Sequence, residues 1–286
     1  MFEFARQSGL GALLVLATLF STAMAAAADS ESSREAPRKR LLLLGQRPDG
    51  HPWSTHEYKA GMRILAQCLQ QISNLQTILV SADEPWTDGP ELLDGADGVV
   101  IFLSQGAHWI HQDPARLDAF KRMAARGGGF VGLHWGMGCR DARFIEEYVQ
   151  LVGGCHGGPD RKFRVLDVTT EVVNPVHPVM QGIDSFKVHE EFYFALKFAK
   201  PQGSITPLLN IPVDGRQHTV AWAWQRPDGG RSFGFSGGHF HENWELEEYR
   251  RLLAQAVLWT LDVPVPAKGL SLEYSQQDLK QPRPKP

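Results

Sequence analysis

The stretch GGGFVGLHWG, residues 127–136, decides the fold that the sequence predicts. Its apolar run from Phe130 to Leu133 is too short for a surface helix and is typical of a buried strand. The run ends at His134, where the chain turns toward a helical pattern that begins near Asp141. Ligands of open α/β sheets bind outside the carboxyl ends of the strands, so His134 is a candidate site residue. The alternative is a histidine that only makes structural hydrogen bonds at a strand end.

Strand patterns and helix patterns alternate on both sides of this stretch. Apolar runs predict buried strands at residues 40–45, 77–80 and 98–103, and spaced apolar residues predict helices at about 56–72, 114–126 and 144–152. Thr55 is a candidate cap for the first helix, and Asp113-Pro114 is a typical start for the second. This alternation predicts an α/β fold with a flavodoxin-like, doubly wound, mostly parallel sheet.

The second half of the chain adds β-rich segments to this pattern. Strands are expected at residues 163–173, 186–198, 205–211 and 218–224. The sequence RPDGG at 226–230 is a strong hairpin turn that leads to a further strand at 232–235. A last amphipathic helix is expected at residues 244–261.

The composition narrows the class of function. The 286 residues carry a formal net charge of -3, which gives no basic surface of the kind that nucleic-acid-binding proteins need. Eight tryptophans and eleven histidines suit a carbohydrate or metal site. The three cysteines make no disulfide framework, although Cys139 and Cys155 would allow one pair.

The first residues are typical of an export signal. An apolar run at residues 10–20 follows Arg6, and Ala23-Met24-Ala25 offers a cleavage site. We therefore expect a signal peptide at 1–25, a flexible tail at 26–38, an α/β domain at 39–265 and a loose tail at 266–286. The protein is expected to be periplasmic or secreted, with no membrane span after cleavage of the signal.

The side chains suited to proton transfer or metal binding lie near the predicted strand ends. In a His-x-His pair on extended chain both rings point to one face, so His239 and His241 suit the binding of a metal or of a shared anion. Glu190 and Glu191 cannot both face inward on a strand, and an apolar setting would raise the pKa of the inward carboxyl and fit it for acid–base work. The candidate residues are, for catalysis, His56, His134 and Glu191; for substrate binding, His51, Glu57, Trp135, His239, His241 and Trp244; for metal binding, His134, His239 and His241.

Six segments together resemble the ThuA-like (trehalose-utilisation) family, whose fold is similar to that of class I glutamine amidotransferases. They are His51-x4-His56-Glu57 with Ala60-Gly61, GGGFVGLH at 127–134, HPVMQG at 177–182, EFYF at 191–194, VAWAW at 220–224 and GGRSFGFSGGHFH at 229–241. The segments occur in the family's order across residues 40–265.

The resemblance also implies what the chain does not do. Amidotransferases of this fold carry a nucleophilic cysteine in Gly-x-Cys-x-Gly after the central strand, and this chain has His134 in its place. Imidazole is a poor substitute for a thiolate in acyl transfer, so glutamine hydrolysis is not expected. Family members are associated with the use of trehalose and other glycosides through keto-sugars. That chemistry needs proton abstraction next to a carbonyl, or addition and elimination at the glycosidic bond. Histidines and a carboxylate would serve it, with or without a divalent metal such as zinc or manganese to polarise the carbonyl.

Three hypotheses follow from these residues. The first is an exported enzyme of carbohydrate catabolism that acts on a keto-sugar or glycoside by lyase, hydrolase or isomerase chemistry. The second is a carbohydrate-binding protein without catalysis, and the third is a metal-binding structural module. The density of ionisable groups at strand ends favours the enzyme.

Overall fold

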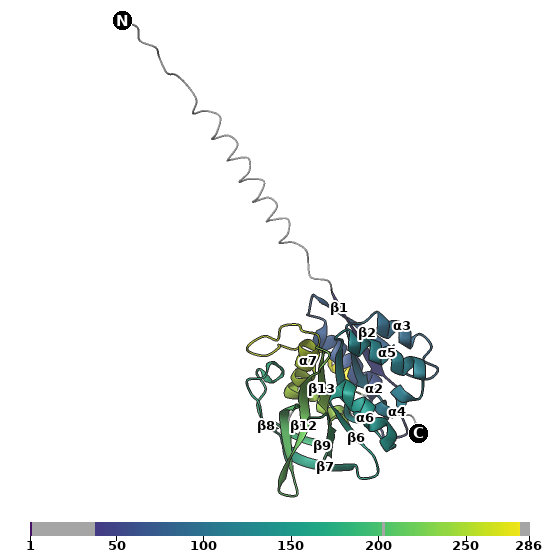
Figure 1. Cartoon of the computed structure of the whole chain (residues 1–286). Helices are drawn as coiled ribbons and strands as arrows, with labels where there is room; N and C mark the ends of the chain where they lie inside the picture. The colour runs from purple at the N-terminus through teal and green to yellow at the C-terminus, as the bar shows by residue number, and fades with distance from the viewer. Residues whose placement is uncertain (2–37, 202–203, 281–286) are drawn as a thin grey trace. The chain divides into compact units, whose positions relative to one another are not determined.

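The computed structural model describes Met1 and residues 38–201 and 204–280 (Figure 1). Apart from Met1, the expected signal peptide lies outside the described residues, and so does the expected N-terminal tail up to residue 37. Within the described part of the chain, no helix is long and apolar enough to cross a membrane.

The domain is a mixed α/β fold built on an eight-stranded, mostly parallel central sheet. Five parallel strands lie in the order β2-β1-β3-β4-β13, and β12, β11 and β8 continue the sheet in antiparallel fashion. The parallel strands are β2 (Leu75–Ser81), β1 (Lys39–Gly45), β3 (Gly98–Phe102), β4 (Gly129–Leu133) and β13 (Arg231–Phe235). The antiparallel strands are β12 (Arg216–Gln225), β11 (Thr206–Val213) and β8 (Glu171–Val172). The five-strand order is that of open doubly wound sheets, as the alternating pattern predicted.

Helices cover both faces of this sheet (Figure 1). On one face, Leu41 and Leu43 of β1 belong to the core formed with α2 and α7. On the other face, Leu42 and Leu44 belong to the core formed with α4, α5 and α6. Successive side chains of a strand point to opposite faces, so a strand buried on both faces needs a continuous apolar run. The helices are α2 (Tyr58–Leu69), α3 (Gly89–Asp94), α4 (Gly106–His111), α5 (Pro114–Ala125), α6 (Ile145–Val152) and α7 (Glu247–Thr260).

Smaller strands and single turns complete the domain. β7 (Lys162–Thr169) and β9 (Lys187–Phe194) form their own antiparallel pair, apart from the central sheet. The others are β5 (Gly138–Cys139), β6 (Gly154–Gly157), β10 (Lys197–Phe198), η1 (His134–Met137), η2 (Ala142–Phe144), η3 (Pro178–Met180) and η4 (His241–Glu245). The last expected helix thus divides into η4 and α7, and Cys139 and Cys155 are buried free thiols.

The C-terminal segment is packed where the sequence predicted a loose tail. Leu270 is buried in the core, and its N–H donates to Oε1 of the buried Gln255. The segment continues to α8 (Gln276–Leu279), and the N–H of Ser275 donates to Gln67 of α2. The apolar residues of this segment are scattered in a polar stretch, so the sequence did not predict that the segment packs against the core.

Candidate functional site

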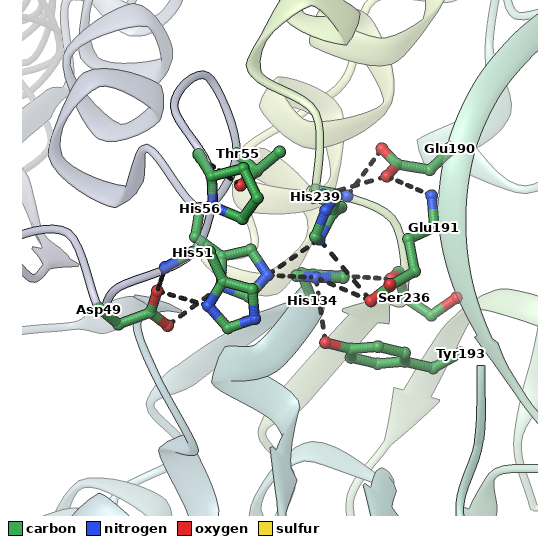
Figure 2. A network of polar contacts seen from close by, with 12 residues as sticks. Asp49, His51, Thr55, His56, His134, Glu190, Glu191, Tyr193, Ser236 and His239 are labelled. Carbon is green, nitrogen blue, oxygen red and sulfur yellow. Dashed lines mark hydrogen bonds and ion pairs between the residues drawn. The ribbon is translucent and has the colours of Figure 1, made fainter. Parts of the chain in front are cut away.

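A cluster of histidines lies at the carboxyl edge of the parallel strands. His51 and His56 come from the loop after β1, His134 from the turn after β4, and His239 from the loop after β13 (Figure 2). Because these strands are parallel, their carboxyl ends meet at one edge of the sheet, as the predicted site required.

Backbone hydrogen bonds join the loop after β1 to the loop after β13. The N–H of His56 donates to the carbonyl of His239 at 3.0 Å, and the N–H of His241 donates to the carbonyl of Ser54 at 2.9 Å. Thr55 and Phe240 form an antiparallel bridge between these bonds. Thr55 therefore serves this bridge and does not cap α2, whose first turn follows Glu57. The ladder fixes His56 and His239 relative to each other.

His134 occupies a strained turn. Its φ is +46°, in the left-handed region that non-glycine residues adopt uncommonly, and His56 has a φ of +54°. Gly136 permits the turn to pass close to β3, because a Cβ there would lie 2.2 Å from the carbonyl oxygen of Ile101. Such outliers persist only where the surrounding structure enforces them, and they concentrate at functional sites.

Three imidazole nitrogens converge at the centre of the cluster. Nε2 of His56 lies 3.0 Å from Nε2 of His134 and 3.0 Å from Nδ1 of His239. All three side chains are buried, with exposed fractions of 2%, 0% and 8% respectively. The three nitrogens lie within 4.8 Å of one another.

Further contacts orient the imidazole rings of His56 and His134. Nδ1 of His56 lies 3.0 Å from the carboxylate of Asp49, and Nδ1 of His134 donates to the carbonyl of Ser236 at 2.9 Å. The hydroxyl of Tyr193 on β9 lies 3.0 Å from Nε2 of His134. Sequence reasoning missed Asp49 and Tyr193, since only the fold brings them to the histidines.

The adjacent carboxylates of β9 both turn toward the site, contrary to the expectation that only one faces inward. Glu190 is fully buried and accepts from the N–H groups of Glu191, Gly238 and His239 and from Asn243. Oε1 of Glu191 lies 3.6 Å from Nδ1 of His239 and 3.9 Å from Nε2 of His134. The side chain of Glu191 is 15% exposed. Among the residues that the structure describes, β9 pairs with β7 alone; the loop after β13 approaches Glu190, and Glu191 reaches the histidines.

Burial shifts the ionisation of the whole cluster. It lowers the pKa of His56, lowers that of His134 well below its usual range and lowers that of His239 to about 3, so the rings are neutral at physiological pH. Burial raises the pKa of Glu191, and it raises the pKa of Glu190 to about 7 despite the four donors around it. Burial opposes ionisation of Asp49 too, but hydrogen bonds from His56, Tyr58 and His51 outweigh it and lower the pKa.

The remaining sequence candidates lie around the cluster or away from it. His51 is exposed at its mouth, with Nδ1 2.7 Å from Asp49 and its ring 3.8 Å from that of His56. Trp135 is 7% exposed and packs edge-on against Tyr193, behind the cluster. Glu57 is half-buried at the start of α2 and is not one of the converging groups.

Trp244 and His241 do not take the places that the sequence predicted. Trp244 is 1% exposed and packs on Phe102 and Tyr249 in the core, so it presents no face to a ligand. His241 begins η4 and is not among the three histidines whose nitrogens converge. His56 takes the place among the converging nitrogens that the His-x-His pattern assigned to His241.

A cleft of ≈ 640 Å³ adjoins the cluster at His239, and His56, His134 and Glu191 are not among its lining residues. His239 lines it together with Trp53, which is 44% exposed. Glu242 and Glu245 of η4 add carboxylates, and Lys280 at the end of the C-terminal segment adds an amine. Trp53 was missed because it stands in a loop with no periodic pattern, although the nearby His51 belongs to the family motif.

Comparison with known proteins identifies the family. The family model ThuA, described as trehalose utilisation, matches residues 48–260. The chain belongs to the ThuA family.

Two solved ThuA-like proteins share its fold. The protein from Bacteroides uniformis ATCC 8492 has 18% sequence identity and a TM-score of 0.61, over 79% of this chain and 92% of that one. The protein from Parabacteroides merdae ATCC 43184 has 19% identity and a TM-score of 0.60, over 86% of this chain and 100% of that one. No curated protein matches the chain in sequence.

Proposed function

We propose that this ThuA-family chain is an exported enzyme of carbohydrate metabolism that acts on a keto-sugar or glycoside by acid–base chemistry. The observation that carries the proposal is the half-buried carboxylate of Glu191 beside three buried histidines at the carboxyl edge of the sheet. The family description, trehalose utilisation, supports a carbohydrate substrate.

Glu191 has the properties of a general base. Burial raises its pKa toward the physiological range, where a base is both deprotonated and strong enough to accept a proton. A keto group acidifies the proton on the neighbouring carbon, and Glu191 would remove that proton. Elimination of a glycosidic leaving group then gives a lyase, whereas return of the proton at another carbon gives an isomerase.

The cleft has the size and lining that a sugar needs. Its ≈ 640 Å³ lies within the usual range for small-molecule sites, about 300–1,000 Å³. The exposed face of Trp53 offers a stacking surface for a sugar ring, in place of Trp135 and Trp244. Glu242 and Glu245 offer hydrogen-bond acceptors for hydroxyl groups. The thiolate that glutamine hydrolysis requires is replaced by His134, so amidotransferase activity is not proposed.

The test is turnover by the purified protein on trehalose, other glycosides and their keto derivatives. Wild type should convert at least one of them, and Glu191→Gln should lower the rate by about 10²–10⁴-fold, the usual contribution of a general base. Glu171→Gln, at an exposed position on β8, is the matched control and should leave the rate unchanged.

Two results would contradict the proposal. Equal rates for wild type and Glu191→Gln would remove Glu191 from the chemistry. Binding of a glycoside with no product from any member of the panel would identify a carbohydrate-binding protein instead.

A further inference from the structure

The tautomers of His56 and His134 are fixed by their outer hydrogen bonds. Nδ1 of His134 faces the carbonyl oxygen of Ser236, which can only accept, so this nitrogen carries the proton. Nδ1 of His56 faces the carboxylate of Asp49, which the hydroxyl of Tyr58 also approaches as a donor. The proton of His56 is therefore on Nδ1 as well.

These tautomers leave two bare nitrogens face to face. Nε2 of neutral His56 and Nε2 of neutral His134 each present a lone pair, and they lie 3.0 Å apart. His239 can donate to His56, and Tyr193 can donate to His134, but neither proton lies between the two Nε2 atoms. A cation placed among these nitrogens makes their contact attractive.

We propose that His56 Nε2, His134 Nε2 and His239 Nδ1 bind one divalent transition-metal ion, with zinc the best fit. Three imidazoles and an open fourth position are a common ligand set for catalytic zinc. With zinc–nitrogen bonds of 2.0–2.1 Å, tetrahedral ligand nitrogens are about 3.3 Å apart. The two observed separations of 3.0 Å are close to this value, so small ring movements admit the ion.

The surroundings of the three nitrogens match those of metal sites. Metal-binding histidines generally donate their other N–H to a carboxylate or a backbone carbonyl, which holds the ring in place. Asp49 does this for His56, and the carbonyl of Ser236 does it for His134. The carboxylates of Asp49 and Glu191 also balance the charge of a divalent ion in a buried setting.

The site deepens the proposed function, because metal binding at the cluster would place a Lewis acid beside Glu191. A bound ion polarises a carbonyl oxygen, which further acidifies the neighbouring carbon that the proposed base attacks. The metal proposal itself does not require any particular sugar, so it is tested by binding and not by turnover.

The experiment is a titration of the full mature protein after treatment with a chelator. Zn²⁺ is added and followed by calorimetry, and Co²⁺ is added and followed by visible absorption, which reports tetrahedral coordination. We expect one ion per chain, with a Co²⁺ spectrum typical of nitrogen and oxygen ligands. His134→Ala and His239→Ala should each weaken Zn²⁺ binding by at least 100-fold.

Two histidine variants serve as controls. His111→Ala removes another largely buried histidine, which pairs with Glu147 away from the cluster, and His241→Ala removes the second histidine of the His-x-His pattern. Both should keep the full stoichiometry. Circular dichroism checks that each variant is folded, and the wild-type titration is informative even if a variant is not.

The outcomes separate this inference from the proposed function. Failure of wild type to bind either ion, or binding that survives both His134→Ala and His239→Ala, would overturn the metal site. Stoichiometric binding that needs these histidines supports it even if no sugar on the panel is converted. Turnover by metal-free protein at the full rate would support the acid–base proposal and show that the metal takes no part in the reaction.

Discussion

The neighbouring strands β4 and β13 carry a buried polar cluster at each end, and the two clusters are organised differently. At the amino end, the guanidinium of Arg226 is enclosed beside the start of both strands. At the carboxyl end, His134 and His239 belong to the nitrogen cluster. Both ends are built on the same parallel pair of strands, so the strands themselves do not account for the difference.

The donors of Arg226 meet acceptors on every side. Its Nε donates to Asp228, its Nη1 to the hydroxyl of Ser232 and its Nη2 to the carbonyl of Gly128. The guanidinium carbon lies 4.7 Å from the ring centre of Phe130. Donors facing acceptors stabilise the fold, and these contacts of Arg226 need no ligand to complete them.

At the carboxyl end, by contrast, acceptors face acceptors. The lone pairs of His56 and His134 oppose each other, and the carboxylate of Glu191 stands close by. The cation that we propose among these nitrogens would make their contact favourable. The comparison teaches that a buried polar cluster is recognised as structural or functional by matching its donors to its acceptors, and not by its burial.

The largest effect on stability should come from breaking the amino-end cluster. Arg226→Met keeps an apolar stem on Phe130 but leaves the Gly128 carbonyl and Asp228 without their partner. We expect the free energy of unfolding to fall by about 3–5 kcal/mol, as when one member of a buried ion pair is removed. Denaturant unfolding measures this.

The control for Arg226→Met is Arg122→Met, which breaks an exposed pair with Asp94. It should leave the free energy of unfolding close to that of wild type, because exposed ion pairs contribute little to stability. Equal losses of unfolding free energy in Arg226→Met and Arg122→Met would show that burial and full pairing do not make Arg226 more important for stability.

At the carboxyl end, a smaller loss of stability should distinguish Glu190 from its neighbour Glu191. Each oxygen of Glu190 accepts two N–H groups, so Glu190→Gln turns an amide NH₂ toward two donors. We expect a loss of about 1–3 kcal/mol in the free energy of unfolding. Glu191→Gln should leave stability within about 1 kcal/mol of wild type and reduce turnover instead. Thermal unfolding of both variants would refute this division if their losses were the same.

The smallest effect should come from the cleft. Trp53→Ala removes the proposed stacking surface, and we expect KM for the sugar substrate to rise about 3–10-fold, the value of an aromatic contact of 0.5–1.5 kcal/mol. Stability and kcat should change little. Phe163→Ala on β7, another exposed aromatic residue at 56%, is the control and should leave KM unaltered. An unchanged KM in Trp53→Ala would place the sugar elsewhere.

The sequence predicted the parts of the fold that depend on burial over several consecutive residues. β1 and β4 were found because strands buried on both faces are written as unbroken apolar runs. The hairpin between β12 and β13 was found because its turn residues are specific. The C-terminal segment was not, because isolated residues such as Leu270 show no period.

The site was predictable to the extent that it follows strand ends. His134 and His239 directly follow the strands that position them, and a position after a strand can be inferred from one sequence. The partners that select a tautomer or complete the cluster, such as Asp49 and Tyr193, are set by tertiary contacts. His241 shows the limit of a local pattern, because the chain turns into η4 at that residue.

The ladder between the loops after β1 and β13 has a consequence for binding. One set of backbone hydrogen bonds holds both His56 and His239, so the backbone at one residue cannot shift unless the other loop moves with it. A ligand therefore meets a preorganised site and does not have to pay the entropy of ordering it. The entropy cost of ordering the site is incurred during folding instead. The energetic cost of the left-handed backbone at His56 and His134 is incurred then as well. Stabilising variants selected at these two positions should therefore tend to be poorer binders.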